Sequence, residues 1–464
     1  MRKLELVAPG GSLEKIEYAY HFGADAAYVG HPNFSLRARI NDFTEKKLEK
    51  AAGIARSRKK KIYFTLNIFA HERHLGILEK HLKFIAKIKP DALIISDPGI
   101  VSLAKKISPK IRIHLSTQAN TTNSEAVRFW EKQGVKRIIL AREVTLEEIK
   151  KIRKACPRIE LEYFVHGAMC MSLSGRCLLS SWMRGRSANL GDCVQPCRWP
   201  YRVTKKEKDI IEIQEDEQGT YIFNSKDLCL IEHLDDLAKA GIDSFKIEGR
   251  TKSVYYVSTV VRNYRMVLDA IKNKKGLKEL KKTVKSAKGE LLKLNNRGYT
   301  TGFLFGKDKW ENNFDLSHEK NRWQFVGEVM KPPNFAYGIS VRSFGGAKFL
   351  EAEKEAFIRR ACGRSFLRKG INNKENTRAS LDSGESRACF AGFKQVKIHN
   401  VLSEKEKVEI VTPSGVISDR VEEIRKEDGE KVKSAHGGSK NVYFIRLKDY
   451  YPEKSLIRKV NSGK

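Results

Sequence analysis

Short apolar runs alternate with amphipathic runs along the first half of the chain, and this alternation constrains the fold more than any other feature. Segments 4–9, 61–69 and 159–167 have the length and composition of strands, whereas 12–23 and 145–156 repeat apolar residues at helical spacing. Strands that alternate with helices are typical of βαβ units, in which crossover helices join parallel strands. The sequence therefore predicts an α/β fold.

The number of strand candidates indicates how the sheet is arranged. About eight or nine of them fall within roughly the first 250 residues, which favours a (β/α)8 TIM-barrel-like domain. An open doubly wound sheet remains the alternative, because closure of a sheet leaves no mark in the sequence. We expect the barrel-like catalytic domain to span residues 1–270.

Two further regions are expected after the barrel. Residues 271–321 are predicted to form a basic helical connector, because apolar positions in 277–294 recur every three or four residues among many lysines. Residues 322–464 contain alternating segments at 394–402, 408–415 and 441–447, which predict a small C-terminal β-barrel domain. A basic, glycine- and serine-rich segment near 343–393 is expected to be an insertion.

Polar side chains follow many of the predicted strands. In a barrel the carboxyl ends of the strands meet at one face, where substrates bind. Turn formation and helix capping account for 9–12 and 96–99. They do not account for the charged residues, so a polar, anion-binding cavity is expected at this face. The candidates are Asn67, Ser116, Thr117, Gln118, Arg142, Glu143, His166, Glu248 and Arg250.

The segment 167–199, called the cysteine segment below, carries four of the eight cysteines of the chain: Cys170, Cys177, Cys193 and Cys197. Intervals of six, fifteen and three residues separate them, and only the last approaches the paired spacing of a structural zinc site. Iron–sulfur clusters accept irregular spacing, because their thiolates need only converge in space. The spacing favours an iron–sulfur cluster, with zinc and unliganded thiols as alternatives.

The charge of the chain indicates its class of partner. Lysine and arginine number 89 against 56 aspartate and glutamate residues, a formal net charge of +33. Such an excess attracts polyanions, with nucleic acid ahead of an anionic membrane surface. The lysines of 277–294 either follow phosphates or form a solvated helix face.

The sequence does not support a membrane-bound or secreted protein, and it lacks the motifs of several enzyme classes. The chain has no apolar run of about 18 residues and no signal-peptide pattern at its start, so we expect no membrane span and a cytoplasmic protein in which disulfides are disfavoured. His71, Glu72 and His74 imitate a zinc-protease motif, but the histidines stand three residues apart where that motif needs four. Neither a serine-hydrolase elbow nor a P-loop occurs.

Long motifs resemble a known family. The segments "ELVAPGGSLEKIEYAYHFGADAAYVG", "EYFVHGAMCMSLSGRCLLS", "GDCVQPCRWPY", "FNSKDLCLIEHLDDLAKAGIDSFKIEGR" and "NRGYTTGFLFG" are similar to the collagenase-like peptidases of unknown catalytic type, the U32 family. The match is closest to members implicated in prephenate-dependent hydroxylation of RNA, including formation of 5-hydroxyuridine at the tRNA wobble position. The resemblance covers the chain from about Leu4 to Phe305.

The resemblance implies a cofactor and its ligands. It implies a 4Fe–4S cluster, with Cys170, Cys177 and Cys193 at the positions of family ligands. Cys197 and Cys229 both match family motifs for the fourth ligand, and Cys229 is preferred narrowly because it would tie distant segments together.

It also implies a substrate site. Arg37, Arg142 and Arg250 are expected to bind a small dicarboxylate co-substrate such as prephenate, with Glu248 beside them, or else to form salt bridges that close the barrel. His166 and Glu143 would then transfer protons.

Three functions stay open at this point. The first is RNA hydroxylation, with tRNA as substrate or with a sister role in ribosomal RNA or ubiquinone hydroxylation. The second is collagenase-like proteolysis, which the family name suggests although no nucleophile–base pair is evident. The third is a non-catalytic RNA-binding or assembly role, which would include a protein partner.

Overall fold

The computed structural model describes residues 4–30, 34–36, 43–170, 172–199, 225–306, 321–331, 392–438, 442–449 and 451–461. The chain divides into two compact units, Met1–Arg322 and Trp323–Lys464. This boundary lies one residue from the predicted start of the C-terminal domain at 322. The predicted connector does not stand apart, because its helix α10 (Leu277–Leu291) packs against α9 (Val254–Lys272) within the first unit.

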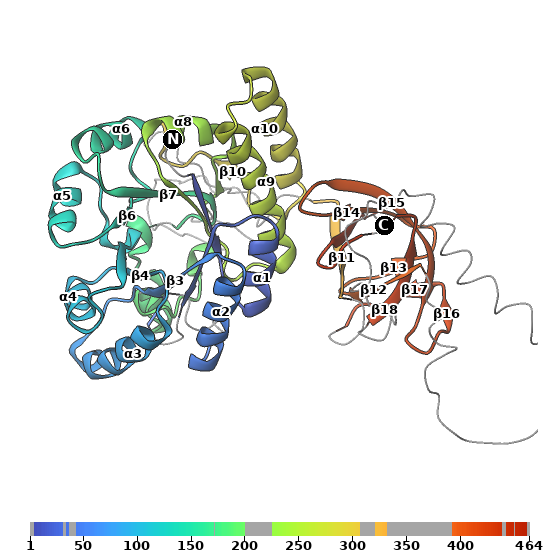
Figure 1. The fold of residues 1–464 in the computed structure, drawn as a ribbon, viewed down its shortest axis with the longest axis horizontal. Coiled ribbons are helices and arrows are strands. Elements are labelled where there is room, and N and C mark those ends of the chain that lie inside the picture. Colours follow the sequence, from blue (N-terminus) through green and yellow to red (C-terminus); the bar gives the residue numbers. More distant parts are fainter. Residues whose placement is uncertain are drawn as a thin grey trace, which may run out of the picture. The chain divides into compact units, whose positions relative to one another are not determined.

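The first unit is a closed parallel barrel, so the prediction of a TIM-like domain is confirmed (Figure 1). The last strand closes the barrel because it pairs in parallel with both the first strand and the seventh. The eight strands are β1 (Glu5–Pro9), β2 (Ala26–Gly30), β3 (Lys61–Leu66), β4 (Ala92–Ile95), β5 (Arg112–Leu115), β6 (Arg137–Ile139), β7 (Glu160–Gly167) and β9 (Ser244–Ile247).

Helices lie outside the strands, and most of them begin at a residue whose side chain caps the first turn. The side chain of Thr145, for example, accepts a hydrogen bond from the Glu148 amide while the Glu148 carboxylate accepts one from the Thr145 amide, which fixes the start of α6. Besides α6 (Leu146–Ala155), the helices of this layer include α1 (Leu13–His21), α2 (Glu45–Ser57), α3 (Leu75–Ile88), α4 (Pro98–Ile107), α5 (Ser124–Lys132) and α8 (Leu234–Ala240). None of the described helices is both long enough and apolar enough to cross a bilayer.

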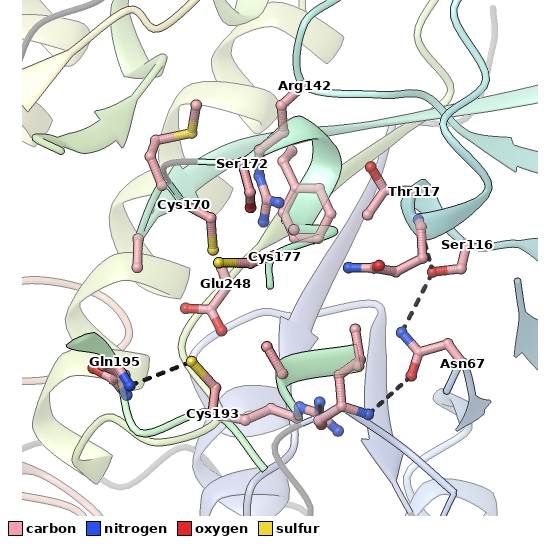
Figure 2. A pocket seen from close by; sticks show the side chains of 18 of the residues that line it. Asn67, Ser116, Thr117, Arg142, Cys170, Ser172, Cys177, Cys193, Gln195 and Glu248 are labelled. Carbon is pink, nitrogen blue, oxygen red and sulfur yellow. Dashed lines mark hydrogen bonds between the residues drawn. The ribbon is translucent and has the colours of Figure 1, made fainter. Parts of the chain in front are cut away.

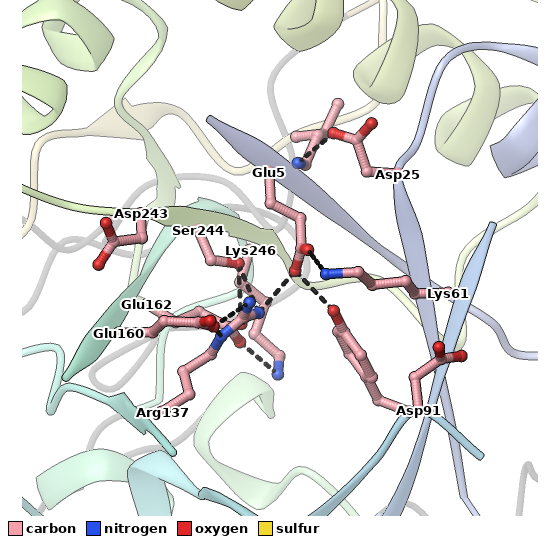
Figure 3. A network of polar contacts seen from close by, with 12 residues as sticks. Glu5, Asp25, Lys61, Asp91, Arg137, Glu160, Glu162, Asp243, Ser244 and Lys246 are labelled. Atoms are coloured by element: carbon pink, nitrogen blue, oxygen red, sulfur yellow. Dashed lines mark hydrogen bonds and ion pairs between the residues drawn. The ribbon is translucent and has the colours of Figure 1, made fainter. Parts of the chain in front are cut away.

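The amino-terminal half of the barrel interior is polar (Figure 3). Arg137 of β6 reaches across the interior to Glu5 of β1 at 2.6 Å and contacts Glu162 of β7 at 2.9 Å. Lys246 of β9 contacts the other Glu162 oxygen, also at 2.9 Å. Burial alone would raise the pKa of Glu5, but the charges of Arg137 and Lys61 outweigh it and lower that pKa to about 2. This network joins strands that are not neighbours in the sheet.

The second unit is a six-stranded antiparallel barrel, as the alternating pattern predicts. Pairing of β14 with β15 closes it, and Val396, Ile410 and Ile445 lie in its fully buried core. The strands are β11 (Trp323–Val329), β12 (Phe393–Ile398), β14 (Lys407–Val411), β15 (Val416–Arg425), β18 (Val442–Leu447) and β19 (Leu456–Val460), with β16 (Lys431–Val432) added to β15 and β13 (Leu402–Ser403) paired with β17 (Ser434–Ala435). Of the predicted insertion, residues 343–391 lie outside the described residues.

Candidate functional site

A cavity of about 140 Å³ lies at the carboxyl ends of the barrel strands (Figure 2). Its floor comes from the strands themselves, through side chains such as Thr65 of β3, Phe164 of β7 and Lys246 of β9. Its walls come from the residues that follow the strands, as the strand-end pattern predicts. These wall residues are Asn67, Ser116, Thr117, Gln118, Arg142, Glu248 and Arg250.

The cysteine segment is bonded to the loops at this face. The Ser174 amide and hydroxyl donate to the two Glu143 oxygens at 2.6 and 2.7 Å, which ties η4 (Leu173–Gly175) to the loop after β6. Arg176 donates through Nε to the Gln118 carbonyl at 2.8 Å, after β5. The Phe69 amide, after β3, donates to the Asn189 carbonyl at 3.2 Å. Three strand-end loops therefore position the segment.

All four cysteines of the segment line the cavity: Cys170, Cys177, Cys193 and Cys197. They are free thiols. Burial, together with smaller contributions from Cys170 and Cys193, raises the pKa of Cys197 to about 11, although Arg198 opposes the shift. The four thiols thus share one cavity.

The loop that carries Cys193 presents an amide to its sulfur. Gln195 adopts φ 57°, a left-handed conformation, and its amide donates to Cys193 Sγ at 3.3 Å. Hydrogen bonds to sulfur tune the potential of iron–sulfur clusters. The donor set, four thiols with an amide–sulfur bond and a neighbouring arginine, therefore fits a cluster in kind and number. Among the described residues no three Cys, His, Asp or Glu side chains already converge on one ion position.

Cys229 lies elsewhere. It ends the short strand β8 (Asp227–Cys229), which pairs antiparallel with β7, and its sulfur accepts from the Tyr264 hydroxyl at 3.8 Å. Burial raises its pKa to about 11. The cavity lining includes Cys197 and not Cys229, so these positions do not support the preference for Cys229 as the fourth ligand.

Four cationic side chains line the cavity: Arg142, Arg198, Lys246 and Arg250. The Arg142 guanidinium carbon lies 4.0 Å from the centre of the Phe164 ring. Arg250 is buried, with Nη1 at 3.5 Å from the hydroxyls of Ser35 and Thr65. Lys246 was not among the predicted site residues. Lys246 stands two residues before Glu248, and side chains two residues apart on a strand point to the same face. This alternation along β9 could have identified Lys246 as a cavity residue. The predicted ligand Arg37 lies outside the described residues.

Glycines allow the close approach around Arg250. A Cβ atom on Gly30 would lie 2.1 Å from Ser35 Oγ and 2.5 Å from Arg250 Nη1. A Cβ atom on Gly11 would lie 2.0 Å from the Arg250 carbonyl oxygen. No side chain fits at either position without displacing Arg250.

The two predicted proton-transfer residues lie behind the cavity rather than in its lining. Glu143 uses both oxygens to hold Ser174, as described above. His166 is 1% exposed and contacts the Tyr264 hydroxyl through Nδ1 at 3.2 Å. Burial lowers the pKa of His166 to about 3, although Asp227 opposes the shift. At neutral pH this imidazole is therefore uncharged.

Known proteins resemble the chain over most of its length. Residues 11–313 match the model of peptidase family U32. A tRNA hydroxylation protein P from Escherichia coli is 34% identical over 505 residues, covering 100% of this chain and 98% of that protein. A Porphyromonas gingivalis protein named collagenase is 32% identical and covers 70% of this chain and 80% of its own length. The 23S rRNA 5-hydroxycytidine C2501 synthase of E. coli is 35% identical over 59% of this chain and 40% of its own length.

Proposed function

This chain belongs to peptidase family U32, and on that premise we propose that it is an RNA-modifying enzyme that hydroxylates tRNA. Relatives named for tRNA hydroxylation and for rRNA 5-hydroxycytidine synthesis support RNA hydroxylation. A net charge of +33 supports a polyanionic substrate. In its finer form the proposal is the conversion of the wobble uridine to 5-hydroxyuridine, because the tRNA relative spans the whole chain whereas the rRNA relative covers 59% of it.

One observation carries the proposal: four thiols and four cationic side chains line the same cavity. We propose that Cys170, Cys177, Cys193 and Cys197 hold a 4Fe–4S cluster there. Such a cluster, when bound, supplies one-electron transfer at a potential that the surrounding hydrogen bonds and charges set. The chain's own residues position the thiols, since Glu143 and Arg176 bond the cysteine segment to the strand-end loops.

We further propose that the cations bind a dicarboxylate co-substrate such as prephenate. Arg142, Lys246 and Arg250 offer donors of fixed position, and the rings of Tyr28 and Phe164 form apolar surface beside them. Charge-assisted hydrogen bonds from guanidinium groups are well suited to carboxylates. In a calorimetric titration with prephenate, Arg142→Gln should weaken binding about tenfold or more. Arg128→Gln, on the outer helix α5, should leave it unchanged.

Proteolysis is less well supported, although one relative is named collagenase. In the described part of the chain, no histidine lines the cavity that could activate a cysteine nucleophile. His166 is buried and bonded to Tyr264. Gelatin cleavage by the purified protein, lost in Cys177→Ala, would favour proteolysis instead.

The test of the proposed function combines nucleoside and metal analysis. Mass spectrometry of tRNA nucleosides from a deletion strain should show loss of 5-hydroxyuridine, which the wild-type gene restores. Cys170→Ala, Cys177→Ala and Cys193→Ala should fail to restore it and should lose iron and sulfide after anaerobic purification. Cys156→Ala is the matched control, because that buried thiol bonds the Ser124 carbonyl on the outer helices.

Two further variants identify the fourth ligand. Cys197→Ala should lose the iron and sulfide, while Cys229→Ala should retain them. The reverse result would assign the role to Cys229. If deletion leaves the level of 5-hydroxyuridine in tRNA unchanged, tRNA hydroxylation is refuted. If the wild-type protein purified without oxygen contains no iron, the cluster is refuted.

A further inference from the structure

Large apolar side chains project from the cysteine segment into solvent. Trp182 is 81% exposed and Leu178 is 75% exposed, the two highest values for large apolar residues in the described part of the chain. Leu173, in the same segment, is 63% exposed. Single exposed apolar residues are ordinary, but a concentration of them beside a cavity marks an interaction surface.

Leu178 is the residue before helix α7 (Leu179–Arg184), and Trp182 lies within that helix. The Trp182 amide donates to the Leu178 carbonyl at 2.9 Å, so the two residues are one helical turn apart. Cys177 and Leu179, which flank Leu178 in the chain, line the cavity. The exposed pair therefore lies at the rim of the proposed active site.

Two arginines of the segment give the same rim a positive charge. Within the described residues neither Arg176 nor Arg184 forms an ion pair with a carboxylate. Arg176 uses Nε to bond the Gln118 carbonyl, and the Arg184 guanidinium carbon lies 5.2 Å from the centre of the Trp199 ring. Arg186, in contrast, is neutralised by Asp192 at 2.8 Å. The rim thus combines an exposed indole with uncompensated cations.

We propose that Leu178 and Trp182 form a stacking surface for unpaired nucleotides of the RNA substrate. An indole face stacks on any base, and neighbouring arginines attract the phosphates that link the bases. When the neighbouring bases leave the RNA stack and stack on this surface instead, the nucleotide between them is free to enter the cavity. A base inside a duplex cannot do so. The inference rests on the proposed function for the identity of the RNA, but binding is measurable without modification.

The test measures binding of a tRNA anticodon stem–loop that has uridine at the wobble position. Trp182→Ala should weaken binding roughly 5- to 150-fold, the range for loss of one base–aromatic stack. Trp182→Phe should retain most of the affinity, because a phenyl ring still stacks. The RNA should quench part of the tryptophan fluorescence, and that part should be absent in Trp182→Phe.

Control variants separate stacking from nonspecific effects. Phe129→Ala removes another exposed aromatic side chain, 54% exposed on α5, and should leave binding unchanged. Arg184→Gln should reduce the salt dependence of binding, whereas Trp182→Ala should shift affinity equally at every salt concentration. A fully paired RNA duplex should bind wild type and Trp182→Ala alike.

The outcomes distinguish this inference from the proposed function. Equal stem–loop affinity of wild type and Trp182→Ala overturns the inference, even if the wild type makes 5-hydroxyuridine. Equal affinity together with lost modification would assign the surface to a protein partner, which also overturns it. Loss of affinity in Trp182→Ala in a protein that modifies no tRNA would support the stacking surface and refute the proposed reaction.

Discussion

Replacing Arg137 by methionine tests whether the polar network in the barrel interior stabilises the fold. Arg137 donates to Glu5 and Glu162, both almost fully buried, and through Nε and Nη2 to Glu160. Methionine keeps much of the side-chain volume but removes the cation. The cations left beside the two buried carboxylates would then be Lys61 at Glu5 and Lys246 at Glu162. Removal of one member of a buried ion network costs about 3–5 kcal/mol.

The pH dependence of stability gives a second estimate of how much the network contributes to the free energy of unfolding. The pKa of Glu5 falls from its ordinary 4.5 to about 2 in the folded barrel. At 1.36 kcal/mol per pH unit this corresponds to about 3 kcal/mol. Because the folded-state pKa is lowered, the contribution is fully present above pH 4.5 and is lost as the pH falls toward 2. In Arg137→Met the cation that lowers the pKa of Glu5 most is missing, so burial should raise that pKa. The loss of stability between pH 4.5 and pH 2 should therefore be smaller than in the wild type.

The assay is urea-dependent hydrogen exchange of peptides from β1 and β7, corrected for intrinsic exchange rates, which reports opening of the barrel apart from the second unit. Arg112→Met is the matched control. Arg112 pairs with Glu160 at 2.7 Å but is 47% exposed, and exposed pairs contribute about 0–1 kcal/mol. If the two variants open with equal free energies, or share the wild-type acid profile, the network does not stabilise the barrel as argued.

Three further predictions concern the site. Glu143→Ala should release Ser174, so that amides of 172–177 exchange faster and tRNA modification falls, whereas Glu147→Ala on the exposed face of α6 should change neither. His166 has a pKa lowered to about 3, so its imidazole signals in NMR spectra should not titrate between about pH 5 and pH 8; a midpoint in that range would contradict its burial. Gly30→Ala should displace Arg250 and reduce prephenate binding and modification. Gly53→Ala, which meets nothing within 4 Å inside α2, should instead raise the thermal midpoint slightly; equal behaviour of the two would refute the steric argument.

Local patterns were sufficient for most of the fold. Side-chain caps such as Thr145, and apolar runs such as those of β3 and β7, identify helices and strands because these depend on residues close in sequence. The residues that end parallel strands also share one face, so Arg142, Glu248 and Arg250 could be placed together beforehand. Closure of the barrel could not, since it depends on β9 pairing with two strands far away in the chain.

The details of the site depended on side-chain direction. Glu143 and His166 stand at strand ends beside cavity residues, yet one binds Ser174 and the other packs against Tyr264. Cys197 and Cys229 match family motifs equally well, but only the former lines the cavity.

The sequence by itself thus determined an α/β domain of alternating strands and helices followed by a small β domain, a polar face at the strand ends and the family to which the chain belongs. The tertiary structure alone decided which thiols share a cavity, that Lys246 joins its cations, and that Trp182 faces solvent at its rim. The physical reason is that strand and helix patterns are set by nearest neighbours in the chain. Cavity membership is set by distances between segments far apart in sequence, such as η4 and the loop after β6, whose contacts no local pattern encodes.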